Sequence, residues 1–456
     1  MLAIVLSTLA LLTAACDCIW TARGYAWLDE NRNGVQDAGE PPLEGVMFLI
    51  DDVRNGYQRV GERGVSDAEG NAEFGVFIAG CPPTEFEVYA LAPAGYEHTT
   101  PPRLPAGQRR NNEEKERFAF GFAYAPGVTP TPRPTPSPMA CRVFTVPYID
   151  TSYRGGIIAF ARDGTGWTAS NVHEPRLLAL APDGRVTEFS RAQDPLGGFA
   201  VNAMAVDADG AVWVGASEGL SRFQPQTGRW DPMDGLRSTR VQDLSVLGAA
   251  LIVHTEAGVE ARTPSGDWRL LIPRDQIQNE FGEFIELDGS VFYLSNDELL
   301  RIWEDPDDGL QWRTLWRRDE REMPMTWIAD GDMAAADVLW LAGKSDELGD
   351  FVASWTLADG EITPYTFQST GGVLGKARIA NIAVGPGGGV WVGVQDELIR
   401  GVASGADAGS MIWTVHDARS LHVPSLDDIR HLAVSPDGAL WVRTTYSWIR
   451  CTEPHP

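Results

Sequence analysis

Residues 29–40 carry oxygen-bearing side chains at the spacing of a calcium-binding loop. The stretch reads Asp29-Glu-Asn31-Arg-Asn33-Gly34-Val35-Gln-Asp37-Ala-Gly-Glu40. Side-chain oxygens fall at positions 1, 3, 5 and 9 of a twelve-residue loop, a glycine at position 6 and a glutamate at position 12. We therefore predict a Ca²⁺ site formed by the side chains of Asp29, Asn31, Asn33, Asp37 and Glu40 and the backbone carbonyl of Val35. The alternative interpretation is a solvated acidic turn.

The segments on either side of this loop favour strands over helices. The approach, Gly24-Tyr-Ala-Trp27-Leu28, has no helical period, and the exit begins with Pro41-Pro42. Proline at these positions does not suit the interior of a helix, and an alternating apolar stretch from Val46 to Ile50 is typical of a strand. The loop is therefore expected in a β-sandwich and not between the two helices of an EF-hand.

The motif Gly24-Tyr-x-Trp27-x-Asp29-x-Asn31-x-Asn33-Gly34-x-x-Asp37-x-Gly39-Glu40 resembles the B-type domain of bacterial serine-aspartate-repeat surface proteins. The later stretch Ser66-Asp67-Ala-Glu-Gly70-Asn71-Ala-Glu-Phe74 resembles a second signature of that family, whereas Gly80-Cys81-Pro82-Pro83 departs from its usual short turn. The resemblance implies an immunoglobulin-like sandwich over residues 18–123, stiffened by calcium and used as a stalk or spacer at a cell surface.

The first fifteen residues are mostly apolar and uncharged, and Ala14 and Ala15 precede Cys16. This length suits a signal peptide better than a membrane span, and the small residues before a cysteine resemble a lipoprotein signal. We predict cleavage after residue 15 and lipidation of Cys16, so that a lipid anchor alone joins the protein to the outer face of a membrane. Simple secretion and an uncleaved anchor are the alternatives.

Five cysteines are present, and lipidation of Cys16 would leave four. Cys18 and Cys81 bracket the first domain, and Cys141 and Cys451 bracket the second. Four cysteines permit three pairings, and their positions favour Cys18–Cys81 and Cys141–Cys451. The alternative for Cys18 and Cys81 is that both are free and packed as small apolar residues.

Proline alternates with threonine and serine through residues 126–138, a composition that keeps a chain extended and unable to form a core. We interpret residues 124–140 as a linker between two domains, and a proline-rich recognition motif is the alternative. The formal net charge of −26 is dispersed along the chain. Such a charge disfavours nucleic acid and other polyanions as partners.

Residues 141–456 contain a repeat in which a strand, an Asp-Gly or Gly-Gly turn and a second strand with a large apolar residue follow one another. Its clearest copies surround Asp209-Gly210, Gly388-Gly389 and Asp437-Gly438. The large residue recurs at Trp167, Trp213, Ile252, Phe292, Trp340, Trp391 and Trp441. This period predicts seven units of about four strands each, that is, a seven-bladed β-propeller.

The copies Asp-Gly-x-Val/Leu-Trp-Val and Gly219-Leu220-x-Arg222-Phe223 resemble the propeller repeats of two-component regulators and of streptogramin-lyase-like proteins. The last unit ends at Cys451, one strand short, while residues 141–147 precede the first unit without a partner. We therefore expect residues 141–147 to supply the outer strand of the seventh blade and to bring Cys141 beside Cys451.

The sequence shows no catalytic constellation. The histidines lack metal-ligand spacing, and neither a nucleophile elbow nor a phosphate-binding loop is present. Loops that join the second and third strands of each blade should line one mouth of the channel; they include residues 171–176, 217–218, 344–347 and 396–397. Tryptophans outside the repeat (Trp20, Trp303, Trp316 and Trp448) are candidates for exposed stacking platforms.

The favoured function is a non-enzymatic surface or secreted protein whose calcium-stiffened stalk presents a propeller that binds a protein or a glycan. The alternatives are an extracytoplasmic lyase or hydrolase, or the sensor component of a signalling system.

Overall fold

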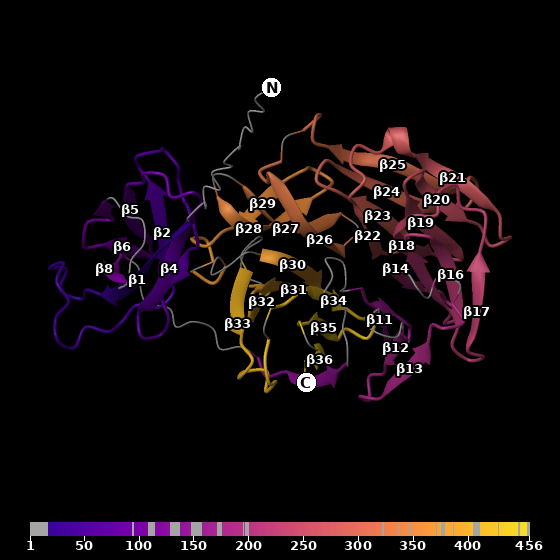
Figure 1. Cartoon of the computed structure of the whole chain (residues 1–456), viewed down its shortest axis with the longest axis horizontal. Helices are drawn as coiled ribbons and strands as arrows, with labels where there is room; N and C mark the ends of the chain where they lie inside the picture. The colour runs from indigo at the N-terminus through magenta and orange to yellow at the C-terminus, as the bar shows by residue number, and fades with distance from the viewer. Residues whose placement is uncertain are drawn as a thin grey trace, which may run out of the picture. The chain divides into compact units, whose positions relative to one another are not determined.

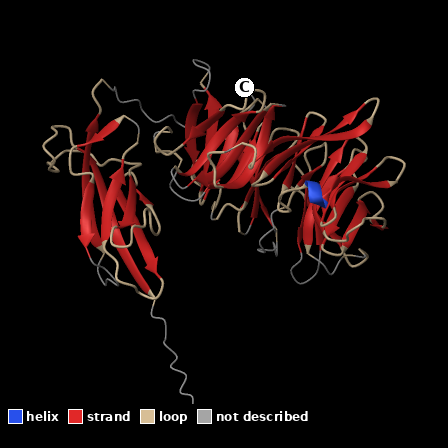
Figure 2. Ribbon diagram, turned by 90° about the horizontal axis from the view of Figure 1, so that it is seen from above, coloured by secondary structure: helices blue, strands red, loops and turns tan. Residues whose placement is uncertain are grey.

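The computed structural model describes residues 17–93, 95–107, 115–127, 137–146, 157–170, 176–194, 196, 200–321, 323–335, 337–345, 348–370, 372–374, 379–385, 387–404, 411–426, 428–445 and 447–453. Over these residues the chain is all-β apart from one turn of 3-10 helix, Arg274–Gln276 (Figure 2). The chain divides into two compact units, Met1–Thr131 with Phe367–Lys376 and Pro132–Thr366 with Ala377–Pro456.

The first unit contains an immunoglobulin-like β-sandwich, as the sequence predicts. One sheet has the order β4-β1-β8-β6 and the other β3-β2-β5-β7. Strand β1 runs antiparallel to β4 and parallel to β8. The strands are β1 (Cys18–Leu28), β2 (Met47–Asp52), β3 (Gly64–Val65), β4 (Asn71–Ile78), β5 (Phe86–Leu91), β6 (Tyr96–His98), β7 (Arg103–Gly107) and β8 (Glu116–Tyr124).

Alternating residues of both sheets face a shared aromatic core. Trp20 stacks on Phe86 with ring centroids 5.3 Å apart, and Phe48 stacks on Phe74 at 5.6 Å. Gly24 lies in β1 where a Cβ atom would come within 2.5 Å of the Phe48 ring, so only glycine leaves room for this side chain. The glycine of the Gly-Tyr-x-Trp motif is thus a packing requirement of the core.

The second unit is a seven-bladed β-propeller: its described residues form seven four-stranded antiparallel sheets, with the strands in sequence order except for β9 in the last blade. The first four blades are β10 (Ala159–Phe160), β11 (Gly166–Ser170), β12 (Arg176–Leu180), β13 (Val186–Ser190); β14 (Val201–Val206), β15 (Val212–Ala216), β16 (Gly219–Gln224), β17 (Arg229–Met233); β18 (Val241–Leu247), β19 (Ala250–Thr255), β20 (Gly258–Arg262), β21 (Trp268–Pro273); and β22 (Glu283–Leu287), β23 (Ser290–Leu294), β24 (Glu298–Asp305), β25 (Gly309–Arg317).

The last three blades complete the ring (Figure 1). They are β26 (Trp327–Ala335), β27 (Val338–Ser345), β28 (Gly349–Thr356), β29 (Ile362–Tyr365); β30 (Ile379–Val384), β31 (Val390–Val394), β32 (Glu397–Ala403), β33 (Met411–His416); and β34 (His431–Val434), β35 (Leu440–Arg443), β36 (Ser447–Thr452), β9 (Ala140–Thr145). Each inner strand from β10 to β30 contacts the inner strand of the next blade.

Strand β9 fills the outer position of the seventh blade, the place that the sequence predicts for residues 141–147. It pairs with β36 in antiparallel register, with Cys141 opposite Cys451. A buried cluster that includes Phe144, Trp441 and Trp448 of this blade and Leu178 and Leu180 of the first blade packs the two ends of the ring together. Strand β9, the first of the propeller in sequence, therefore completes the last blade and joins the two ends of the ring.

The large apolar residues of the repeat occupy one structural position. All seven lie in the second strand of their blade and are buried. Neighbouring blades pack face to face, and a large apolar side chain is needed to fill the space between them. The period of the repeat indicates this role for the seven residues. Tight turns separate the first and second strands; at Asp209-Gly210, for example, Gly210 adopts φ 78° and its N–H donates to Asp207 O at 2.9 Å.

Candidate calcium loop and propeller mouth

The loop of residues 29–40 begins at the end of a buried strand. Strand β1 ends at Leu28, and the N–H of Asp29 donates to Phe122 O of β8 at 2.7 Å. This bond places Asp29 inside the sheet, where its side chain is 0% exposed. A carboxylate at such depth must be stabilised by partners, because burial without them is costly.

Backbone N–H groups of its own loop donate to Asp29. Asn33 N–H donates to one carboxylate oxygen at 3.1 Å, and Gly34 N–H donates to the other at 2.7 Å. Burial opposes ionisation of Asp29, but the Thr99 side chain and these backbone N–H groups outweigh it and hold the pKa of Asp29 below its ordinary value. These donors therefore favour the ionised form of Asp29 at the base of the loop.

The remaining predicted ligands gather above Asp29. Asp37 Oδ2 accepts hydrogen bonds from Asn31 Nδ2 and Asn33 Nδ2, both at 2.7 Å. The Glu40 carboxylate accepts from the backbone N–H of Glu30 at 3.0 Å and from that of Asp37 at 2.9 Å. Val35 is exposed, and its N–H donates to Asn33 Oδ1 at 2.7 Å. The structure thus brings the side chains of positions 1, 3, 5, 9 and 12 into one small loop.

The donor chemistry of this loop fits Ca²⁺, whereas the side-chain orientations do not form a coordination shell. Oxygen donors from carboxylates and amides are the ligands that Ca²⁺ prefers. Within the described residues, however, no three His, Cys, Asp or Glu side chains are arranged to hold a metal. Asn31 and Asn33 direct their amide nitrogens at Asp37, so both amides would have to turn their oxygens inward for an ion to bind.

Two disulfides are present, one in each domain. Cys18 of β1 is bonded to Cys81, with the Cα atoms 5.3 Å apart, and Cys141 is bonded to Cys451, with the Cα atoms 4.0 Å apart. These are the two pairs that the positions of the cysteines in the sequence favour. Cys16 and the signal peptide of residues 1–15 lie outside the described residues.

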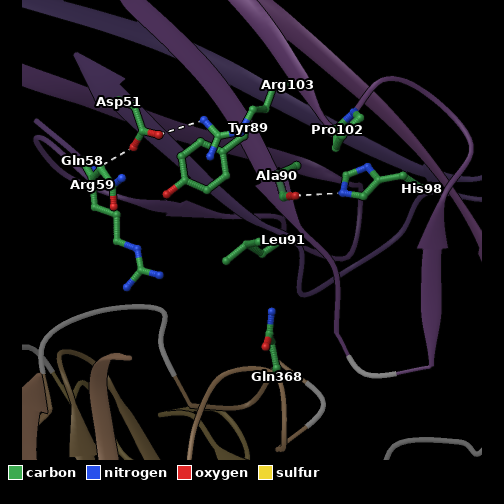
Figure 3. A pocket seen from close by; sticks show the side chains of 10 residues that line it. All are labelled: Asp51, Gln58, Arg59, Tyr89, Ala90, Leu91, His98, Pro102, Arg103 and Gln368. Carbon is green, nitrogen blue, oxygen red and sulfur yellow. Dashed lines mark hydrogen bonds and ion pairs between the residues drawn. The ribbon is translucent and has the colours of Figure 1, made fainter. Parts of the chain in front are cut away.

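The outer face of the sandwich carries a polar cluster on β2, β5 and β7 (Figure 3). Arg103 forms an ion pair with Asp51 at 2.8 Å and lies over the Tyr89 ring at 4.3 Å. His98 of β6, in the other sheet, packs against Phe122 and has its Nε2 2.9 Å from Ala90 O; burial lowers the pKa of His98 despite that bond. Because Arg103 and Asp51 pair with each other within the sheet, we interpret the cluster as surface packing.

The tryptophans outside the repeat do not form exposed platforms. Trp20, Trp316 and Trp448 are buried and Trp303 is half-buried, which makes the expectation of exposure wrong. Trp20 belongs to the sandwich core, and Trp316 packs edge-on against Trp355 with centroids 5.8 Å apart. Aromatic residues off the repeat position fill irregular gaps between sheets, a role that period alone does not reveal.

The described histidines of the propeller strands lie apart and are packed against aromatic rings. His254 contacts Tyr293, His416 contacts Trp391 and His431 contacts Trp448. Burial lowers the pKa of His416 and of His431 to about 4, and the positive charges of Arg400 and Arg443 act in the same direction. His416 and His431 are therefore neutral at ordinary pH, and the structure does not bring the three histidines together as an acid–base pair.

Acidic side chains on the inner strands connect consecutive blades, a feature that reasoning from the sequence missed. Asp330 and Asp332 of β26 accept hydrogen bonds from Ile382 N–H and Val384 N–H of β30, at 2.9 and 2.7 Å. Asp243 of β18 accepts from Phe284 N–H of β22 in the same way, at 2.5 Å. The period-2 spacing of Asp330 and Asp332 in an otherwise apolar strand was the available signal.

These carboxyls are also crowded by one another. Desolvation raises the pKa of Asp330 to about 7 and that of Asp332 to about 6. Desolvation, reinforced by the charges of Asp330 and Asp243, raises the pKa of Glu283 well above its ordinary value. The folded propeller therefore favours the protonated forms of these carboxyl groups more than the unfolded chain does.

A known family model matches the sandwich and includes the whole loop. Residues 23–113 match the model of the SdrD B-like domain. This match agrees with the resemblance seen in the sequence and covers all of the predicted Ca²⁺ ligands. No curated protein matches the chain in sequence.

Solved structures share the fold of the propeller. A streptogramin B lyase has 14% identity and a TM-score of 0.50, covering 70% of this chain and 98% of its own. A chain of a mitotic checkpoint complex has 14% identity and a TM-score of 0.50, covering 73% and 97%. The extracellular domain of a hybrid two-component system from B. thetaiotaomicron has 13% identity and a TM-score of 0.47, covering 69% and 39%. At these identities the likeness concerns the fold alone.

The SdrD B-like domain and the two disulfides indicate an extracytoplasmic protein that carries a propeller. Among the described residues, no helix has the length and apolar character needed to cross a membrane.

Proposed function

We propose that this chain is a non-enzymatic surface or secreted protein in which a calcium-stiffened SdrD B-like domain supports a ligand-binding propeller. The observation that supports the proposal is the match of residues 23–113 to the SdrD B-like domain, and the predicted calcium ligands of residues 29–40 lie within the matched stretch. Cys16 anchors the protein to the outer face of a membrane by lipid, or the protein is secreted. The partner is a protein or a glycan, and nucleic acid is disfavoured by the net charge of −26.

The role of calcium is to lock the segment between β1 and β2. Asp29 is held charged at the base of the loop, and Asp37 and Glu40 bring two further carboxylates within it. A divalent ion would relieve the repulsion among these groups and replace weak amide contacts by metal–oxygen bonds. Extracellular calcium modules bind in the range of about 10⁻⁴–10⁻³ M, so the site would be filled outside the cell and empty inside it.

Residues 124–140 act as the linker between stalk and propeller, and their prolines favour an extended chain over a collapsed one. The closed ring of seven blades is a rigid platform whose strand-joining loops supply the contact surface. Binding residues on loops held by a rigid scaffold are the usual arrangement in such folds. Of the loops predicted at this mouth, the structure describes residues 217–218 and 396–397. Residues 171–175 and 346–347 lie outside the described residues.

The test measures binding and turnover together. The full chain, with disulfides intact and Ca²⁺ present, is melted against a panel of glycans, cell-wall fragments and extracellular proteins, and each mixture is analysed for new products. A ligand at 100 times its Kd should add about 2.7 kcal/mol of stability. Saturable stabilisation without product supports the proposal. Product formation, or no stabilisation by any member of the panel, contradicts it.

A further inference from the structure

One end of the propeller is defined by the register of its inner strands. Val201 of β14 lies opposite Ala216, and Val241 of β18 lies opposite Thr255. The first residues of β14 and β18 are therefore at the same end as the loops that follow β15 and β19. This is the mouth at which the sequence predicts ligand contacts, and β14, β18 and β22 are consecutive inner strands around it (Figure 1).

Both inner strands carry a β-bulge directly after their first residue. The pairing of β14 skips Asn202, and the pairing of β18 skips Gln242. A bulged residue is left out of the ladder, and its side chain is turned away from the regular alternation. Two amide side chains in consecutive blades are thus placed at equivalent positions at the mouth.

A cavity of about 140 Å³ lies at these bulges and is lined by Asn202, Arg240, Gln242 and Phe281. A water molecule occupies about 30 Å³ of liquid, so the cavity has room for a group the size of about five waters. Typical ligand pockets are larger, roughly 300–1,000 Å³. The cavity is therefore the size of a subsite for one residue of a longer ligand.

The polar groups of the cavity differ in how far they are already satisfied. Asn202 Nδ2 donates to Val241 O at 2.9 Å, and Arg240 forms an ion pair with Glu256 at 3.0 Å. Gln242 is only 9% exposed, and its Oε1 is buried without a hydrogen-bond partner among the described residues. A buried polar atom without a partner costs about 1–3 kcal/mol. Rotation of the Gln242 amide toward the cavity would bring this atom within reach of a ligand donor, and the new hydrogen bond would recover that cost.

Phe281 adds an apolar surface to this polar set. It is 64% exposed, and its backbone N–H is fixed by Asn279 Oδ1 at 2.9 Å. An aromatic ring held at the rim of a polar cavity suits a ligand with an apolar C–H face and hydroxyl groups at its edge. Amide side chains both donate to and accept from hydroxyls, as does the Arg240–Glu256 pair taken together.

We propose that this cavity is the subsite for one neutral sugar ring of a glycan, with the ring on Phe281 and its hydroxyls on the amides of Asn202 and Gln242. A carboxylated sugar is disfavoured because Arg240 is already paired with Glu256 and because the chain carries a net charge of −26. This inference rests on the proposed function, since it names the ligand class of the binding propeller.

The experiment titrates the full chain with methyl glycosides of glucose, galactose and N-acetylglucosamine and with methyl glucuronoside, using ligand-observed NMR. A single subsite should give a Kd near the millimolar range, equivalent to about −4 kcal/mol. Phe281→Ala removes the stacking surface at an exposed position and should weaken binding at least about fivefold. Gln242→Glu keeps the side-chain shape and should weaken it as well. Ile412→Ala, an exposed apolar residue of β33 on the outer edge of its blade, is the matched control and should bind like the wild type.

The inference is supported if a neutral glycoside binds the wild type and the control and is weakened by both cavity variants. Equal binding by Phe281→Ala, Gln242→Glu and the wild type overturns the subsite and leaves the proposed binding function intact. Preference for the glucuronoside also overturns it. If no glycoside binds while the melting panel identifies a protein partner, the sugar subsite is wrong and the binding propeller stands.

Discussion

Cys141 and Cys451 lie directly opposite each other in the register of β9 and β36, with their Cα atoms 4.0 Å apart and their sulfurs bonded. The bond spans 310 residues of sequence and joins the first strand of the propeller to the last blade. A ring closed by strand pairing alone can open at that seam, and the disulfide holds the seam shut.

Removal of this bond should destabilise the propeller. The chain-entropy model gives about 5–6 kcal/mol for a closed loop of this length, with measured values commonly about 2–4 kcal/mol. We expect Cys141→Ser with Cys451→Ser to lower the midpoint of propeller unfolding and to speed hydrogen exchange in β9 and β36. Cys18→Ser with Cys81→Ser is the control and should affect the sandwich alone. Unchanged exchange in β9 and β36 would contradict the role of the bond.

The carboxyl groups of the inner strands should make propeller stability depend on pH. The pKa of Asp330 is raised to about 7 in the folded state from an ordinary value of 3.8, so the folded state retains a proton that the unfolded state releases. This contribution is fully present below about pH 4 and is lost as the pH rises to about 7. A tenfold change in the proton affinity of one group alters the free energy of unfolding by about 1.4 kcal/mol, so the thermal midpoint should move by about a few degrees.

Buried His416 and His431 have lowered pKa values, so their contribution to stability changes with pH in the opposite direction to that of Asp330. Both proteins carry these histidines, so the comparison of Asp330→Asn with the wild type isolates the contribution of Asp330. At pH 5 the two proteins should have similar thermal midpoints. By pH 8 the midpoint of Asp330→Asn should be higher than that of the wild type. Asp209→Asn, at an exposed hairpin turn, should follow the wild type. A constant difference between wild type and Asp330→Asn across this range would show that Asp330 does not titrate there.

The fold could be predicted because its signals are local and repeated. The glycine-rich hairpin turns and the large residue of each second strand recur at a fixed period, and each copy reports the same structural position. The Cys141–Cys451 bond followed from counting strands, since the last blade was one strand short. The position of Trp20, Trp316 and Trp448 did not follow, because side-chain burial off the repeat depends on neighbouring sheets.

The functional residues were harder to predict for a physical reason. The calcium-type ligands of residues 29–40 lie in one continuous loop, so their spacing alone suggests the chemistry. The mouth cavity joins Asn202, Arg240 with Gln242, and Phe281 from separate blades, and it depends on two bulges. Nothing in a single strand indicates that its pairing will skip one residue.

Lipidation of Cys16 is a separate prediction. Expression of the full chain in a bacterium with labelled fatty acid should label the protein, and mass spectrometry should place the modification on Cys16 as the new N-terminus. Cys16→Ser should remove the label and release the protein from membranes, because the lipid is the predicted attachment. Labelling that persists in Cys16→Ser, or cleavage elsewhere, would refute this assignment.

Hydrogen exchange of the full chain with and without Ca²⁺ tests the central claim most directly. At a few millimolar Ca²⁺, above the range of about 10⁻⁴–10⁻³ M expected for such modules, exchange should slow in residues 29–46 and the sandwich should unfold at a higher temperature. Asp29→Ala with Glu40→Ala should abolish both effects, whereas Glu30→Gln, which removes an exposed charge from a non-ligand position of the same loop, should keep them. A calcium-stiffened stalk would be contradicted if Ca²⁺ changed neither the exchange nor the unfolding temperature of the wild type, or if the double variant responded to Ca²⁺ like the wild type.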